Sequence, residues 1–233
     1  MKYPKINSLW KRQGWFLEGD KKKDPQYQAG RQSFIVGDYA VPEFGNIRIW
    51  HVQEKIDGTN IRVEYKLERD GPRNTVLTLE YKGRTDEAMI PVSLHRYLHN
   101  AFPASVLQNT FQLGEEEQKI EVTLFGEGYG PKIQAGGGNY REDQGFILFD
   151  VVVDGWWLKQ EDVEKIAARL NVPYAPFIGY MTEEQIVAYV KSKPMSLCSK
   201  TPQVMEGIIA RPAQLLLLRD GSPLLMKLKC KEF

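Results

Sequence analysis

The chain passes from one predicted strand to the next through Glu54-Lys55-Ile56-Asp57-Gly58-Thr59-Asn60. Apolar residues from 47 to 52 precede this stretch, and apolar and polar residues alternate from 61 to 66, which is the period of a strand. Lys55 therefore follows a strand end, where a lysine whose pKa is lowered by burial or neighbouring cations can act as a nucleophile. Gly58 would let the backbone approach a ligand closely. Taken alone, however, this stretch fits a solvated lysine in an Asp-Gly turn better than it fits a nucleophile.

Outward from this stretch, the pattern contains more strands than helices. Alternation predicts a hairpin from 61–66 and 76–82, and further strands at 120–127, 146–153, 205–211, 214–219 and 224–230. Helical spacing predicts helices over 91–102 and 161–170, and a capping box at Thr182 opens a third through about Val190. Strands that follow one another directly favour an α+β fold with largely antiparallel sheets over a parallel doubly wound fold. The first forty-odd residues, including Lys21-Lys22-Lys23-Asp24-Pro25, are expected to be irregular.

Several later segments carry polar or aromatic residues that suit a nucleotide. Arg84 follows a strand and offers a planar fork for phosphate or ribose oxygens. Glu127, flanked by glycines at a strand end, suits a ribose hydroxyl or a hydrated metal ion. Phe149 could stack on a purine. Each residue also has a purely structural interpretation. Arg84 would be a surface charge, Glu127 would lie in a glycine-rich turn, and Phe149 would belong to a buried strand.

The last such segment pairs Glu206 with Lys227 and Lys229. The two lysines are two residues apart on a predicted strand, so they face the same side. Their ammonium groups repel each other unless an anion lies near them, and a triphosphate meets that need. A solvated strand face meets it equally well.

The order of these segments along the chain is more specific than any one of them. In this order and together, they resemble the covalent nucleotidyltransferase superfamily of DNA ligases, RNA ligases and mRNA capping enzymes. The stretches Lys55 to Asn60 and Phe125 to Gln134 are similar to RNA ligases, particularly the phage nick-sealing type. Asn60 stands where DNA ligases and capping enzymes usually carry Arg. The resemblance covers residues 5–233.

The resemblance implies a nucleotidyltransferase (ATP-grasp-like) domain with mainly antiparallel sheets flanking a nucleotide-binding groove. It implies ATP as the AMP donor, Mg²⁺ or Mn²⁺ as the metal, and Lys55, Lys227 and Lys229 as catalytic residues. AMP would pass from Lys55 to the 5′-phosphate of an RNA end, and a 3′-hydroxyl would then displace it. The implied nucleotide contacts are Glu54, Lys55, Asn60, Arg84, Glu127, Phe149, Glu206, Lys227 and Lys229, with Glu206 and Glu127 also near the metal.

Other functions remain open at the level of sequence. A GTP-dependent capping guanylyltransferase or a DNA ligase would use the same scaffold, but Asn60 argues against both. The chain ends four residues after Lys229, so we expect one RNA ligase domain over residues 1–233 without a C-terminal OB or accessory domain. A protein partner could then supply RNA binding. A non-catalytic nucleotide- or RNA-binding module would not need the lysine set.

Composition sets only broad limits. The chain has 31 Lys and Arg against 30 Asp and Glu. Contact with RNA ends or nicked RNA would therefore require a local patch of positive charge, because the chain as a whole is nearly neutral. Cys198 and Cys230 lack metal-binding spacing and are expected to be free thiols. The longest apolar run, Leu215 to Leu218, is too short to span a bilayer, and no signal peptide is visible. The cytoplasm, or the host cytoplasm for a viral protein, is the expected location. Gly136 to Gly138 is expected to be a mobile surface loop.

Overall fold

The computed structural model describes residues 1–12, 34–71 and 74–233, and these form two compact units. Unit 1 comprises Met1–Tyr3, Ile56–Ala175 and Cys198–Thr201. Unit 2 comprises Pro4–Lys55, Pro176–Leu197 and Pro202–Phe233. The boundary therefore falls directly after Lys55, inside the stretch that the sequence singled out.

Unit 1 is built on a sheet whose five described strands are antiparallel to their neighbours. Its strand order is β6-β5-β7-β8-β9. These strands are β5 (Thr59–Asp70), β6 (Asn74–Gly83), β7 (Lys119–Tyr129), β8 (Gly145–Val153) and β9 (Trp156–Trp157). The predicted hairpin is confirmed, since β5 and β6 pair from Ile61 opposite Gly83 to Asp70 opposite Asn74.

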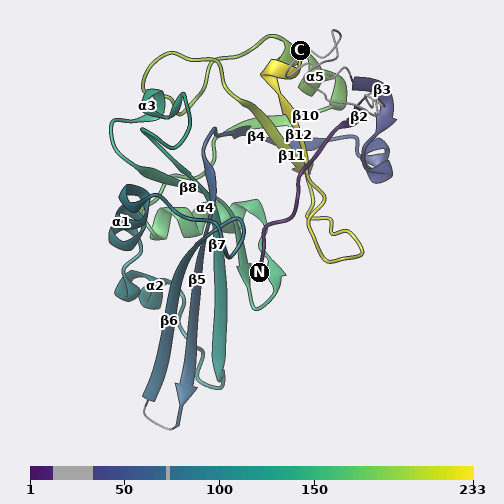
Figure 1. Ribbon diagram of the computed structural model, residues 1–233. Coiled ribbons are helices and arrows are strands. Elements are labelled where there is room, and N and C mark those ends of the chain that lie inside the picture. The colour runs from purple at the N-terminus through teal and green to yellow at the C-terminus, as the bar shows by residue number, and fades with distance from the viewer. Residues whose placement is uncertain (13–33, 72–73) are drawn as a thin grey trace. The chain divides into compact units, whose positions relative to one another are not determined.

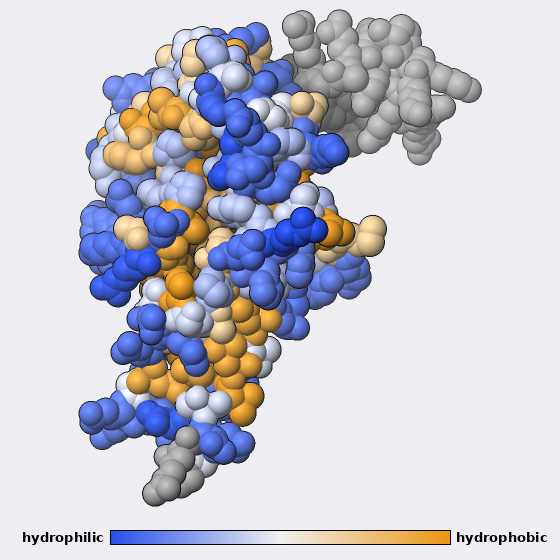
Figure 2. All heavy atoms as spheres, turned by 90° about the vertical axis from the view of Figure 1, so that its left-hand side faces the viewer, coloured by the Kyte–Doolittle hydropathy of each residue, from blue (hydrophilic) through white to orange (hydrophobic). Residues whose placement is uncertain are grey.

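Helices cover one face of this sheet (Figure 1). They are α1 (Val92–Ala101), α2 (Ala104–Thr110) and α4 (Gln160–Arg169). Leu98 of α1, Leu107 of α2 and Val163 of α4 pack with alternate strand residues such as Val63 and Leu124. Because side chains alternate along a strand, Asn60 and Glu127 lie on the other face. Figure 2 shows hydrophobic surface on the side of α1 and α2, above the tip of the β5–β6 hairpin.

Unit 2 contains a second sheet, with strand order β1-β12-β11-β4-β10. These strands are β1 (Asn7–Ser8), β12 (Met226–Lys229), β11 (Gly207–Pro212), β4 (Trp50–Lys55) and β10 (Phe177–Met181). β1 is parallel to β12, and the other pairs are antiparallel. β2 (Trp10–Arg12) and β3 (Phe34–Tyr39) form a separate antiparallel pair, and 3₁₀ turns lie at η1 (Pro42–Asn46) and η2 (Cys230–Glu232). The predicted α+β fold with mainly antiparallel sheets is confirmed.

The core of unit 2 lies on one face of this sheet. Trp50 and Val52 of β4 and Met226 and Leu228 of β12 pack there with Ile186 of α5 (Glu183–Lys191). The predicted capping box begins α5, since Thr182 and Gln185 exchange side-chain to backbone hydrogen bonds. Residues of odd number on β4 and β12, including the three candidate lysines, therefore face away from this core.

Some expectations from the sequence are wrong. Residues 214–219 form no strand and make only an isolated bridge at Leu217. Leu216 and Leu217, in the middle of this run, are 43% and 46% exposed, whereas Leu218 packs against the unit 2 core. The N-terminal part contains the short strands β1, β2 and β3 rather than only irregular chain. The Lys21 to Pro25 stretch lies outside the described residues.

Two further features concern location and redox state. No helix within residues 1–12, 34–71 and 74–233 has both the length and the apolar character that a membrane crossing requires. Cys198 and Cys230 form no disulfide within the described residues, as expected, and burial raises the pKa of the Cys230 thiol.

Candidate active site

Lys55 and Lys229 lie at the same level of the unit 2 sheet, on either side of Gly207. In the strand register Gly207 stands opposite Lys55 on β4 and opposite Lys229 on β12. A Cβ at Gly207 would come within 2.1 Å of the Leu228 backbone oxygen, so no side chain fits there. The close approach of the β12 backbone therefore requires glycine at the position between the two lysines.

Glu206 joins these two lysines. Its Oε2 lies 2.5 Å from Lys55 Nζ, and its Oε1 lies 2.6 Å from Lys229 Nζ. The side chains of Lys55, Glu206 and Lys229 are only 20%, 12% and 23% exposed. The Lys55 amine is therefore sheltered from solvent and lies next to Lys229, with which it shares the Glu206 carboxylate.

Lys227 projects from the same face of β12, two residues before Lys229. Partial burial, followed by the nearby ammonium groups of Lys229 and Lys55, lowers the pKa of Lys227. Within the described part of the chain Lys227 makes no salt bridge. We define the lysine cluster as Lys55, Lys227, Lys229 and Glu206. Its three positive charges exceed its single negative charge, so it is suited to bind an anion.

Glu54 points to the face of β4 opposite Lys55. Its carboxylate is 98% buried and accepts hydrogen bonds from the Ser196 hydroxyl at 2.5 Å and the Leu197 backbone N–H at 2.7 Å. These bonds fix the strand end that carries Lys55. Sequence reasoning missed Ser196, because no local pattern marks a hydroxyl that pairs with a residue 142 positions away.

In unit 1, Asn60 of β5 and Glu127 of β7 are cross-strand neighbours on the face without helices. The Asn60 Oδ1 atom is buried and has no hydrogen-bond partner among the described residues, so it is ready to accept a bond from a ligand. Gly58 is needed here for packing, since a Cβ at this position would lie 2.4 Å from the Gly128 backbone oxygen. Close packing against strand β7 therefore requires glycine at position 58.

Arg84 and Phe149 flank this pair. Arg84 directly follows Gly83, which stands opposite Ile61, and its side chain is exposed. Phe149 lies where the β7–β8 register shifts, and its ring packs edge-on against Tyr3 at a centroid distance of 5.0 Å. The Tyr3 hydroxyl donates to Asp150 at 2.6 Å, so the position of Phe149 is supported on that side.

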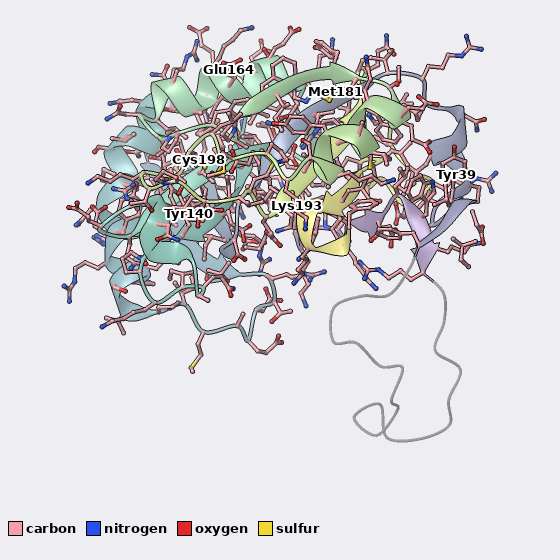
Figure 3. The ribbon with its side chains drawn as sticks, turned by 90° about the horizontal axis from the view of Figure 1, so that it is seen from above. Tyr39, Tyr140, Glu164, Met181, Lys193 and Cys198 are labelled. Atoms are coloured by element: carbon pink, nitrogen blue, oxygen red, sulfur yellow. The ribbon has the colours of Figure 1, made fainter. Side chains whose placement is uncertain are left out.

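The glycine run after β7 is structured, and the expectation of a mobile loop is wrong. Residues Gly137–Tyr140 form the helical turn α3. A Cβ at Gly137 would lie 2.0 Å from the Gly130 backbone oxygen, so close packing requires glycine there. Tyr140 packs with Ile56 and with Cys198, which is labelled beside it in Figure 3. The Tyr140 hydroxyl accepts the Asp57 backbone N–H at 3.3 Å. α3 therefore supports the residues that follow Lys55.

The acidic residues fit a hydrated metal ion rather than a protein-built cage. No group of three His, Cys, Asp or Glu side chains in residues 1–12, 34–71 and 74–233 could hold a metal. Glu206 and Glu127, the two predicted metal contacts, belong to different units and each offers one carboxylate. Mg²⁺ bound with a nucleotide keeps several waters and needs only one or two carboxylates besides the phosphates.

The family model for RNA ligase matches residues 48–229. This range includes the lysine cluster and all the nucleotide contacts that the sequence predicts. The chain belongs to the RNA ligase family. No curated protein matches this RNA ligase chain in sequence.

Solved structures share the fold. A Naegleria gruberi RNA ligase mutant with AMP and Mn is 19% identical, covers 81% of this chain and 52% of its own, and has a TM-score of 0.55. An apo mutant of the same enzyme is 19% identical, covers 79% and 50%, and has a TM-score of 0.51. This RNA ligase chain thus spans about half the length of the solved chains that it matches.

Proposed function

We propose that this chain is an ATP-dependent RNA ligase that carries AMP on Lys55. The observation that supports this most is the lysine cluster, in which the sheltered Lys55 amine lies beside two further lysines on one sheet face. Simple nucleotide binding would not need a lysine held at the end of a rigid strand. Membership of the RNA ligase family is consistent with this chemistry.

In the first step the Lys55 ammonium loses its proton to solvent, and the neutral amine attacks the α-phosphorus of ATP. A phosphorus–nitrogen bond forms, the bond from phosphorus to the bridging oxygen breaks, and pyrophosphate leaves. Lys227 and Lys229 contact the α-phosphate and stabilise its developing charge. An incoming phosphate also competes with Glu206 for both ammonium groups, which frees Lys55 from its salt bridge.

The remaining residues bind and orient the nucleotide. Asn60, Arg84 and Glu127 contact ribose or phosphate oxygens, and Phe149 stacks on adenine. Glu54, which the sequence placed among the nucleotide contacts, acts indirectly, because its buried carboxylate lies on the other face of β4 and fixes the strand end that carries Lys55. Glu206 and Glu127 are the residues that would contact a hydrated Mg²⁺ or Mn²⁺, and such an ion would neutralise charge on the phosphates. Positioning and charge neutralisation account for most of the catalysis in such displacements at phosphorus.

Two further displacements complete the reaction. The 5′-phosphate of an RNA end attacks the AMP phosphorus and releases Lys55, and a 3′-hydroxyl then attacks the RNA phosphorus and releases AMP. We propose that both units act together as one nucleotidyltransferase domain. A protein partner that presents the RNA ends belongs to the same proposal.

Intact mass after incubation with Mg²⁺ and ATP tests the first step. We expect one added AMP on the wild-type chain, none on Lys55→Ala or Lys55→Met, and full labelling of Lys66→Ala, whose exposed lysine pairs with Glu68 in unit 1. AMP labelling of Lys55→Ala would refute the assignment. Labelled GTP in place of ATP distinguishes a capping enzyme, and DNA strands in place of RNA distinguish a DNA ligase.

A further inference from the structure

Arg12 is a cation at the edge of the lysine cluster that no sequence pattern marks. It ends β2 in unit 2, directly after β1, and its Nη2 donates to the Ser8 hydroxyl at 3.3 Å. Ser8 stands opposite Lys227 in the parallel pairing of β1 with β12. The hydrogen bond therefore holds the guanidinium beside the strand that carries Lys227.

The charge of Arg12 acts on the lysine cluster. The positive charge of Arg12 is among the causes that lower the pKa of Lys227, after burial, Lys229 and Lys55, and Glu232 opposes them. Glu232 is only 3% exposed, forms a salt bridge with Arg12 and accepts the Lys229 backbone N–H at 2.9 Å. With Arg12 and Glu232 included, four cations face two carboxylates, which leaves a net positive charge for a polyanion.

The order of these cations across the sheet matches the geometry of the first step. The strands lie in the order β4, β11, β12, β1, so Lys55 comes first, the lysines of β12 come next, and Arg12 beside β1 comes last. In a displacement at phosphorus, the attacking and leaving atoms lie roughly in line on opposite sides. If Lys55 attacks a phosphorus held at β12, the leaving group points toward β1.

We propose that Arg12 binds the β- and γ-phosphates of ATP and the pyrophosphate that leaves. The assignment rests on the proposed function of the lysine cluster. Arg12 is suited to the task because its planar fork can contact two phosphate oxygens at once. Its side chain is 34% exposed, more than Lys55 or Lys229, so the outer phosphates would meet a cation that opens to solvent and lets the product leave.

The test compares Arg12→Ala with Lys11→Ala. Lys11 neighbours Arg12 on β2 but pairs with Asp38 and is 56% exposed, so it controls for loss of a cation from this strand. Loss of a charged hydrogen bond predicts that Arg12→Ala lowers kcat/KM for ATP in AMP-adduct formation by about 10- to 100-fold. The half-saturating pyrophosphate concentration in the reverse reaction should rise by a similar factor. Sealing of RNA that already carries AMP on its 5′-phosphate should not change, because that step needs no triphosphate.

A second variant separates phosphate binding from the structural pairing with Glu232. Arg12→Ala leaves the buried Glu232 carboxylate without this partner, whereas Arg12→Ala with Glu232→Gln removes both charges. The double variant should remain defective toward ATP and pyrophosphate. Recovery of wild-type ATP dependence in the double variant, or an equal defect in sealing pre-adenylylated RNA, would overturn the proposal.

Calorimetric titration with pyrophosphate gives a readout that needs no chemistry. We expect wild-type and Lys11→Ala chains to bind pyrophosphate at least tenfold more tightly than Arg12→Ala. Equal affinities would refute the Arg12 assignment. Failure of the wild-type chain to form an AMP adduct would instead count against the ligase function, while the titration would still decide the role of Arg12.

Discussion

Lys227 illustrates how a residue that we propose to bind phosphate can lower the stability of the ligand-free protein. Its pKa is lowered, so the native chain holds the Lys227 proton less tightly than the unfolded chain. Between that lowered pKa and the ordinary value of about 10.5, the unfolded state binds more protons, and stability rises with pH. Below this window the charged form destabilises the fold by a constant amount.

We therefore expect Lys227→Met to stabilise the ligand-free chain while it weakens ATP binding. Solvent screening of a partly exposed lysine keeps the gain below about 1 kcal/mol, or a Tm increase of about 1–2 °C at pH 7. The variant should also lose the alkaline rise in stability. Thermal denaturation from pH 7 to 10.5 measures both effects, with Lys66→Met as the exposed control. A lower Tm for Lys227→Met at pH 7 would contradict the interpretation.

Glu206 has the opposite role, since it neutralises two ammonium groups. Glu206→Gln would leave Lys55 and Lys229 close together without their shared carboxylate, so we expect a loss of about 1–2 kcal/mol and a Tm lower by about 3–6 °C. Glu121→Gln is the matched control, because Glu121 also contacts two lysines, Lys66 and Lys119, but is 52% exposed. That variant should change stability by less than about 0.5 kcal/mol. Similar losses in both variants would show that burial of the Glu206 carboxylate does not matter.

Local pattern was enough to propose some residues of the candidate site but not others. Lys55, Glu206, Lys227 and Lys229 sit at strand ends or on one strand face, which alternation predicts from the sequence. Arg12 carries no such signal, because it reaches Glu232 across 220 residues of chain. Such pairings depend on which strands lie side by side, and a single sequence does not state this.

At the scale of elements, α3 shows how a glycine run can look like a loop and yet be packed. Gly137 cannot be replaced by a residue with a side chain, because the Gly130 backbone oxygen occupies the space where a Cβ would be. Gly138 has nothing within 4 Å of its Cβ position. Adjacent glycines in one turn therefore have opposite requirements, which composition does not distinguish.

We expect Gly137→Ala to destabilise unit 1 and Gly138→Ala to be neutral or slightly stabilising. Overpacking against backbone costs about 1–3 kcal/mol, whereas alanine in place of an unconstrained glycine gains up to about 1 kcal/mol. Because α3 supports Asp57 through Tyr140, Gly137→Ala should also slow formation of the AMP adduct. Thermal denaturation and adduct kinetics measure the two effects. Equal Tm values for the two variants would show that α3 can shift to accommodate a Cβ at position 137 without loss of stability.

At Leu215 to Leu218 the error was the opposite one, because a strand was predicted where the structure has a loop. Four consecutive apolar residues predicted a strand, but Leu216 and Leu217 are exposed and the segment makes only one bridge. The core of unit 2 is already filled by Met226, Leu228 and their neighbours on β4, β11 and α5. An apolar run becomes a core strand only when a sheet edge with unfilled core is available, which is a property of the whole fold.

At the scale of the whole molecule, charge balance bears on the proposed contact with RNA. The formal net charge is +1, and many described lysines and arginines already contact neighbouring carboxylates. Proteins that track a nucleic acid backbone through 6–10 phosphate contacts lose about 10³- to 10⁵-fold in affinity between 50 and 200 mM salt. With a formal net charge of only +1, the chain should contact only about two or three phosphates.

We therefore expect a shallow salt dependence for a 5′-phosphorylated single-stranded RNA. With a slope of about −0.7 per phosphate contact, affinity should fall by no more than about 20-fold between 50 and 200 mM NaCl. Fluorescence anisotropy with labelled RNA measures this, and Arg84→Ala should reduce the slope by about 0.7 if Arg84 contacts an RNA phosphate rather than ATP. Saturation of the chain with AMP on Lys55 keeps the nucleotide site constant across the titration. A loss of 10³-fold or more would reveal an extended phosphate-binding track and would remove the need for a partner that presents the RNA ends.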